Sequence, residues 1–221
     1  MNLVKRAKMD KPVFFRRPFK YTFFHSVFIL ILINVIVYIA GRFYPMLDAC
    51  LALNVGTVIY YKWFWQFFTY MFVHGNFSHI FFNMLGLLFF GLNIEKIWGS
   101  KEFLLFYLVC GVFSGVLSFA VYFFTGATNV FLMGASGALY SILFAYAVTF
   151  PRSVIFIWGI IPVPAPVLVL IYAIIELVSQ FFGGGNIAHM THLFGFLCAW
   201  AYFRIRMGIR PLRIWKDVFK K

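Results

Sequence analysis

The stretch FLLFYLVCGVFSGVLSFAVYFF, residues 103–124, contains no charged side chain. It is long enough for a helix to cross the hydrocarbon core of a bilayer, which takes about 20 apolar residues. The rest of the chain has the same character: 63% of its 221 residues are hydrophobic, 11% are charged, and the mean hydropathy is +0.91. Soluble domains carry about 25% charged residues. The sequence therefore predicts an all-α membrane protein and argues against soluble enzymes and nucleic-acid-binding proteins.

Hydropathy and charge together predict the topology. Six membrane spans are expected, at residues 23–40, 77–93, 103–124, 134–149, 167–182 and 187–203. Most of the 19 Lys and Arg residues lie outside this six-helix membrane domain (23–203), in a basic N-terminal arm (1–22) and a basic C-terminal tail (204–221). Basic flanking segments mark the cytoplasmic side and contact anionic lipid headgroups. Two cytoplasmic termini require an even number of spans, and six fits. The first span lacks a small-residue cleavage site, so we expect a retained span and not a signal peptide.

Two further apolar stretches are predicted not to cross the bilayer. Residues 51–73 include Asn54, Lys62 and Gln66 and are rich in Tyr and Trp, which favours a long membrane-associated loop between the first two helices. In residues 154–166, alternating prolines forbid a continuous helix, so a connector along the membrane surface is expected.

Polar residues gather near the outer ends of three predicted spans. Asn83 lies in the second span, Ser136 begins the fourth, and His192 lies early in the sixth. Polar groups inside membrane spans are costly and mark functional sites by default. Gly134 and Gly137 flank Ser136, and the fourth span is short, which indicates a helix that starts below the membrane surface. Irregular backbone at that depth must be buried in protein or line a water-filled cavity.

Each polar motif has a structural alternative when it is considered alone. Small residues around Ser136 also suit close helix packing. His79 and Asn83, one helical turn apart, suit either an oxyanion site or a hydrogen-bond network between helices. His189 lies on the same helical face as His192 and competes for any role assigned to it.

The motifs taken together carry a resemblance to a known family. His74-x4-His79-x3-Asn83, then Gly134-x-Ser136-Gly137 with Tyr140, and then His192-x2-Gly195 follow one another in the chain. This order resembles that of the rhomboid intramembrane serine proteases, and the similarity extends over about residues 65–203. It implies a six-helix rhomboid-like bundle and proteolysis of transmembrane segments.

The resemblance also implies a role for each matching residue. Ser136 would be the nucleophile and His192 its general base, with Tyr140 stacked beneath the imidazole. The oxyanion hole would comprise the backbone N–H of Ser136 with His79 and Asn83. The remaining matches are the preceding histidine, His74, and the loop glycines, Gly134 and Gly137.

Two positions depart from the family pattern. In the family pattern two glycines follow the histidine, and the second of them is Ala199 in this chain. The extra methyl group puts in doubt how closely this helix approaches its neighbour. Gln66 replaces an arginine before the second span, which puts that residue's role in the loop in doubt.

The sequence predicts a Ser–His dyad without a third member. A carboxylate would be needed to orient the imidazole in a triad, and Glu176 is the one acidic residue well inside a span. Nothing in the sequence places it beside His192, so Glu176→Gln is expected to leave most of the activity. The expected partners are the bilayer and transmembrane protein substrates, with no metal, no small-molecule cofactor and no nucleic acid.

Three alternatives remain open at this stage. A metalloenzyme would use the histidines, but H-E-x-x-H is absent and no carboxylate accompanies them in the sequence. A catalytically silent rhomboid-like binding or chaperone protein would lack the serine or the histidine. A transporter would show internal repeats, and none is evident. A bacterial inner membrane is the expected location, with the site opening to the outer side.

Overall fold

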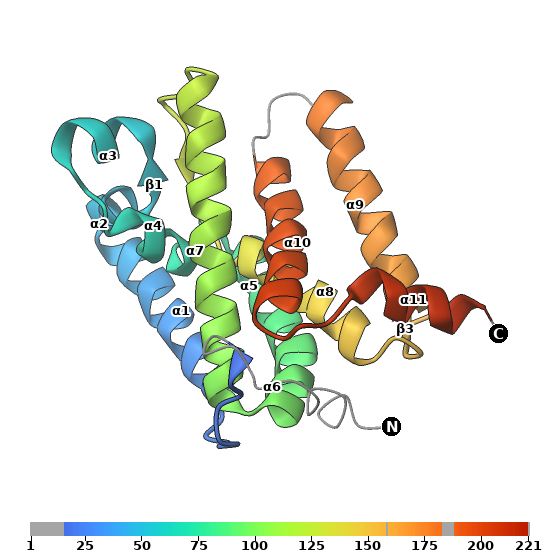
Figure 1. Ribbon diagram of the computed structural model, residues 1–221. Coiled ribbons are helices and arrows are strands. Elements are labelled where there is room, and N and C mark those ends of the chain that lie inside the picture. The colour runs from blue at the N-terminus through green and yellow to red at the C-terminus, as the bar shows by residue number, and fades with distance from the viewer. Residues whose placement is uncertain (1–15, 158, 183–187, 221) are drawn as a thin grey trace.

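The computed structural model describes residues 16–157, 159–182 and 188–220, and this part of the chain is mostly helical (Figure 1). Its longer helices pack side by side. They are α1 (Ser26–Phe43), the continuous α5 (Phe77–Gly86), π-helical η4 (Leu87–Gly91) and α6 (Leu92–Trp98), then α7 (Ser100–Phe124), α8 (Ser136–Thr149), α9 (Ala165–Phe182) and α10 (Ala188–Ile205).

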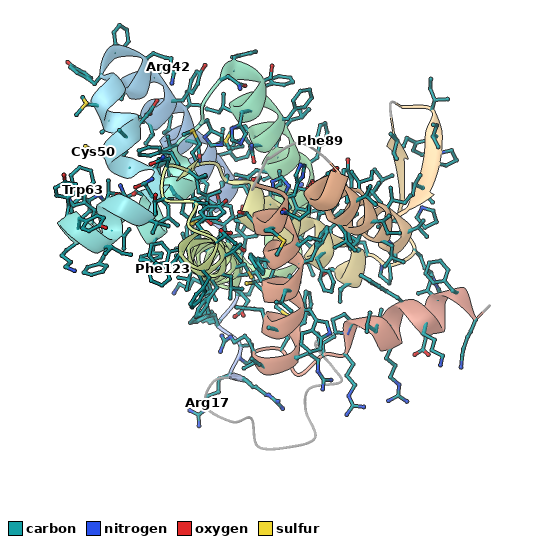
Figure 2. The ribbon with its side chains drawn as sticks, turned by 90° about the horizontal axis from the view of Figure 1, so that it is seen from above. Arg17, Arg42, Cys50, Trp63, Phe89 and Phe123 are labelled. Carbon is teal, nitrogen blue, oxygen red and sulfur yellow. The ribbon has the colours of Figure 1, made fainter. Side chains whose placement is uncertain are left out.

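Each predicted span overlaps one of these helices, but the support for crossing differs among them. Among the described helices, three are long and apolar enough to span a bilayer: α1, Phe77–Trp98 and α7. Large apolar side chains such as Phe89 (60% exposed) and Phe123 (49% exposed) point outward from the bundle, as expected of lipid-facing residues (Figure 2). Crossing by the shorter α8, and by α9 and α10, stays a prediction, as does the six-span count. The glycine segment predicted to join the last two spans lies outside the described residues.

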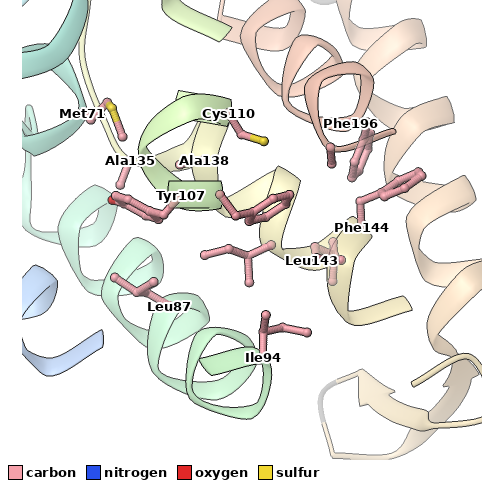
Figure 3. Packing of buried hydrophobic residues seen from close by; sticks show 14 of the residues in the cluster. Met71, Leu87, Ile94, Tyr107, Cys110, Ala135, Ala138, Leu143, Phe144 and Phe196 are labelled. Atoms are coloured by element: carbon pink, nitrogen blue, oxygen red, sulfur yellow. The ribbon is translucent and has the colours of Figure 1, made fainter. Parts of the chain in front are cut away.

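Helix α8 occupies the centre of the bundle. Its buried residues face every direction, which is the pattern of a core helix and not of a surface helix. Ala138, Leu143 and Phe144 lie among apolar side chains from the neighbouring helices, including Leu87, Cys110 and Phe196 (Figure 3). Figure 1 shows that the chain descends from the end of α7 before α8 begins near the middle of the bundle. The start of α8 below the membrane surface stays a prediction.

The loop between α1 and α5 is folded into short helices. It contains α2 (Pro45–Leu51), α3 (Val55–Tyr61), α4 (Gln66–Thr69) and the 3₁₀ turn η3 (Tyr70–Phe72). Gln66 is fully buried, accepts hydrogen bonds from the Asn54 backbone (3.2 Å) and the Thr57 hydroxyl (2.7 Å), and donates to the Cys50 carbonyl (3.2 Å). Gln66 therefore holds this loop together through hydrogen bonds, although the family pattern has an arginine at this position.

In the described residues, two short strand pairs accompany the predicted helical fold. Strand β1 (Leu53–Asn54) pairs with β2 (Phe131–Leu132), and β3 (Val154–Ile157) pairs with β4 (Ile161–Pro164), both antiparallel. The β3–β4 hairpin lies in the proline-containing connector. Proline blocks a helix but is tolerated in an edge strand, where its nitrogen need not donate.

The basic C-terminal tail contains an amphipathic helix, α11 (Pro211–Phe219), which the sequence analysis did not predict. Trp215 is buried and its indole N–H donates to the carbonyl of Ala147 in α8 (3.0 Å). Nearby, Arg206 forms an ion pair with Glu102 in α7 at 2.8 Å. These contacts fix the tail against the ends of two core helices.

Candidate active site

Ser136 is the first residue of α8, and the loop before it is held in an unusual conformation. Gly134 has a φ of +117°, and a Cβ atom there would lie 2.6 Å from the His79 Nε2. Only glycine combines that backbone angle with so close a neighbour. The Gly134 N–H donates to the Tyr70 carbonyl (2.9 Å), and the Ala135 N–H donates to His74 Nε2 (3.4 Å). Two of the predicted site histidines therefore pack against the loop that presents Ser136.

His74 serves this loop as a neutral ring. It is buried just before α5, and burial together with the neighbouring His79 lowers the pKa of His74 to about 4. A neutral ring keeps Nε2 free to accept the Ala135 N–H. His74 thus contacts the loop that presents Ser136, and its role in the site stays a prediction.

The Ser136 hydroxyl and the His192 ring meet across the contact between α8 and α10. Ser136 Oγ lies 2.8 Å from His192 Nε2. The helices approach closely because Gly195 has no side chain: a Cβ there would lie 2.3 Å from the carbonyl oxygen of Gly137. The Tyr140 ring stacks on the imidazole, with centroids 4.1 Å apart and planes at 9°. The structure thus brings Ser136, Tyr140 and His192 together, and their catalytic roles stay a prediction.

His79 and Asn83 do not form a matched pair of donors. The Asn83 amide donates to the His79 carbonyl within α5 (2.7 Å), while its Oδ1 is buried without a hydrogen-bond partner among the described residues. His79 lies against Gly134, as described above. The prediction that His79 and Asn83 together stabilise an oxyanion stays a prediction.

Glu176 provides the main correction to the sequence analysis. Its Oε1 lies 2.9 Å from His192 Nδ1, and its Oε2 lies 2.6 Å from His189 Nδ1. The Tyr140 hydroxyl also donates to Oε1. The contact with His192 has the distance of an ion pair but lies off the direction of a Nδ1–H hydrogen bond. The prediction that His192 has no carboxylate beside it was therefore wrong.

The same three side chains form the one cluster in the described ranges that could hold a metal ion. Glu176, His189 and His192 each offer a ligand atom, and these atoms lie within 4.8 Å of one another. Two imidazoles and a carboxylate suit zinc. The sequence analysis discounted a metal because no carboxylate accompanied the histidines, and the structure removes that argument. Glu176 also contacts both histidines directly.

Comparison with known proteins decides the family. A model of the rhomboid domain matches residues 61–208, which is more than half of the chain. The chain belongs to the rhomboid family. Relatives include "RHOMBOID-like protein 12, mitochondrial" of Arabidopsis thaliana, 30% identical over 154 residues, which cover 63% of this chain and 46% of that protein.

Bacterial members of the rhomboid family are also similar. YdcA of Bacillus subtilis is 28% identical over 153 residues, covering 68% of this chain and 70% of YdcA. "Rhomboid protease GluP" of the same organism is 34% identical over 79 residues, covering 36% of this chain and 14% of GluP. The chain spans about half, or less, of the length of the plant relatives. Together with the apolar helices, family membership makes this a membrane protein.

Two residues of this rhomboid domain, Glu176 and Thr191, lie near the site without having been placed there from the sequence. Glu176 carried a signal, since an acidic residue inside a span faces the bundle interior and pairs by default. Thr191 carried none. It precedes His192, is 1% exposed, and its hydroxyl lies 2.7 Å from that of Ser118 in α7. This contact joins α10 to α7 at the residue before His192.

An apolar groove of about 400 Å³ lies next to the site of this rhomboid domain. Its lining includes Phe82 from α5, Leu139 and Tyr140 from α8, and Tyr172 from α9. Tyr140 thus borders both the groove and the imidazole. No charged side chain among the described residues lines this groove.

Proposed function

We propose that this rhomboid-family protein is an intramembrane serine endopeptidase in which Ser136 is the nucleophile and His192 is the general base. The observation that carries the proposal is the 2.8 Å separation of Ser136 Oγ and His192 Nε2. A serine hydroxyl is a weak nucleophile until an adjacent base takes its proton, and this distance permits the transfer. Stacking on Tyr140 restricts rotation of the ring.

The first half of the proposed reaction forms an acyl-enzyme. Ser136 Oγ attacks the carbonyl carbon of the scissile bond while its proton moves to His192 Nε2. The carbonyl oxygen becomes an oxyanion, and the free N–H groups at the start of α8, with the positive end of that helix, are suited to stabilise it. His79 is a further candidate donor. His192 then gives its proton to the leaving nitrogen as the C–N bond breaks.

The second half releases the product by hydrolysis. A water molecule attacks the ester carbon and loses a proton to His192 Nε2. The tetrahedral intermediate collapses, the bond from carbon to Ser136 Oγ breaks, and the proton on His192 returns to the serine oxygen. A carboxylic acid leaves and the enzyme is regenerated, with no cofactor consumed.

Transmembrane segments of other membrane proteins are the proposed substrates. The apolar groove beside Tyr140 supports this proposal, because it offers no charged lining to a soluble polar peptide. We also propose six crossings, both termini in the cytoplasm in contact with lipid headgroups, a site that opens to the outer side, and a bacterial inner membrane as the location. The basic segments 1–22 and 204–221 support this orientation.

Cleavage of a transmembrane substrate in liposomes tests the proposal. Ser136→Ala and His192→Ala are expected to lose cleavage to background. His25→Asn is a matched control, because His25 has a left-handed backbone (φ 57°), which asparagine tolerates, and it lies at the start of α1. A fluorophosphonate should label the wild type at Ser136. Cleavage by Ser136→Ala at the wild-type rate would overturn the proposal. A folded wild type that neither cleaves nor reacts with the probe would favour the silent binding protein.

A further inference from the structure

Glu176 is a buried acidic group whose described contacts all lead to the candidate active site. The residue is 5% exposed, whereas its neighbours Ile174, Ile175, Leu177 and Val178 on α9 are exposed on the outside of the bundle. An uncompensated carboxylate inside a membrane protein is strongly unfavourable. Its position therefore depends on the partners that it finds on α8 and α10.

Those partners occupy both carboxylate oxygens. Oε2 lies 2.6 Å from His189 Nδ1, and Oε1 receives the Tyr140 hydroxyl and lies 2.9 Å from His192 Nδ1. His189 and Tyr140 thus fix the carboxylate in place, from two different helices. A carboxylate fixed in this way can act on the third partner, His192, without having to be ordered first.

The two nitrogens of His192 face opposite groups. Nε2 faces Ser136 and Nδ1 faces Glu176. A carboxylate near Nδ1 favours the tautomer that carries the proton there, which leaves Nε2 free to accept the serine proton. When that transfer occurs, the imidazolium forms with a negative charge already 2.9 Å away.

We propose that Glu176 is a positioning residue for His192, selecting its tautomer and stabilising its protonated form from α9. This inference rests on the proposed function. Because Oε1 lies off the Nδ1–H direction, the interaction is mainly electrostatic, and the effect should be smaller than the roughly 10⁴-fold loss known for a carboxylate hydrogen-bonded directly to the base. Glu176→Gln is expected to lower kcat about 10- to 100-fold.

The test separates kcat from KM in the liposome assay. Glu176→Gln keeps the shape of the side chain and removes its charge, so kcat should fall while KM stays within about twofold. Glu176→Asp restores the charge on a shorter side chain and should recover several-fold of that loss. Glu102→Gln is the matched control: Glu102 is another buried carboxylate, but it pairs with Arg206 and Tyr202 away from the site. Its kcat should match the wild type at temperatures where it is folded.

Several outcomes would overturn the proposal. Wild-type kcat in Glu176→Gln, with Ser136→Ala inactive, would remove the role of Glu176 and leave the proposed function intact. Equal losses in the Gln and Asp variants together with a lower melting temperature would assign a structural role. Cleavage abolished by a chelator and restored by Zn²⁺ would assign the three groups to a metal ion. Absence of both cleavage and fluorophosphonate labelling in the folded wild type would instead remove the proposed function.

Discussion

Replacing Gly195 by alanine tests whether the close approach of α8 and α10 sets the geometry of the candidate site. The new Cβ would lie 2.3 Å from the Gly137 carbonyl oxygen and 3.1 Å from Tyr140 Cβ. The first of these atoms belongs to the backbone of a buried helix, so it cannot rotate away as a side chain could. Real Cβ atoms essentially never approach within 3.0 Å, so α10 must move by about 0.7 Å, the difference between 3.0 and 2.3 Å.

This displacement of α10 would change the distance between Ser136 on α8 and His192 on α10. If the whole shift is added to the 2.8 Å between Ser136 Oγ and His192 Nε2, the distance becomes about 3.5 Å, which is too long for an effective hydrogen bond. Misplacement of reacting groups by about 1 Å can cost about 10²-fold in rate. Overpacking also costs about 1–3 kcal/mol of stability. We expect Gly195→Ala to cleave about 100-fold more slowly than the wild type.

Gly111→Ala separates the geometric effect from the loss of stability. A Cβ at Gly111 would lie 2.2 Å from Met71 Cε, which is as severe a clash, but it falls on the end of a flexible side chain. Cleavage in liposomes and melting temperature should be measured for both variants. Gly111→Ala should cleave within about threefold of the wild type despite a similar loss of stability. Wild-type cleavage by Gly195→Ala, or an equal loss in both variants, would refute the reasoning.

Two further predictions concern stability. Glu95, fully buried, accepts hydrogen bonds from the Ser26 N–H (2.6 Å) and hydroxyl (2.7 Å) at the start of α1, so Glu95→Ala should lower the free energy of unfolding by about 3 kcal/mol. An unchanged midpoint in denaturant titration would contradict this role. Gln66→Ala leaves the Asn54 N–H and the Thr57 hydroxyl without their acceptor and should make the loop between α1 and α5 open to protease at lower concentrations than in the wild type. Equal protease resistance would show that the loop does not depend on this side chain.

The long helices could be predicted because their signal is local. An uncharged stretch such as 103–124 is best accommodated in a bilayer as a helix, and the structure has α7 at Ser100–Phe124. Ser136 and His192 were assigned from short motifs that reflect local needs, a glycine-flanked turn and a small residue at a helix crossing. Their mutual contact followed from the family resemblance and not from spacing.

The position of Glu176 could not be predicted for a different reason. It depends on the rotation of α9 about its axis and on its depth relative to α10, and both are set by packing along the whole length of each helix. The sequence of residues 183–187, between these helices, predicts neither the rotation of α9 nor its depth relative to α10. The contacts of Gln66 could not be predicted either. Its partners Asn54 and Thr57 precede it by 12 and 9 residues and belong to other elements, so their contact depends on how the loop folds.

The length of α8 explains why the chemistry is gathered where it is. Its 14 residues span about 21 Å, whereas the 25 residues of α7 span about 37 Å and the hydrocarbon core is about 30 Å thick. If α8 crosses the bilayer as proposed, with its C-terminal end near one surface, it begins about 10 Å below the other. The free N–H groups of its first turn then lie in a medium of low dielectric constant, where they interact more strongly with a developing negative charge than they would in water. The same medium penalises every unpaired polar group, so Ser136, His192 and Glu176 are stable there only as a connected set. A single requirement, a helix that starts at depth, thus accounts for both the proposed catalytic power of the site and its chain of mutual contacts.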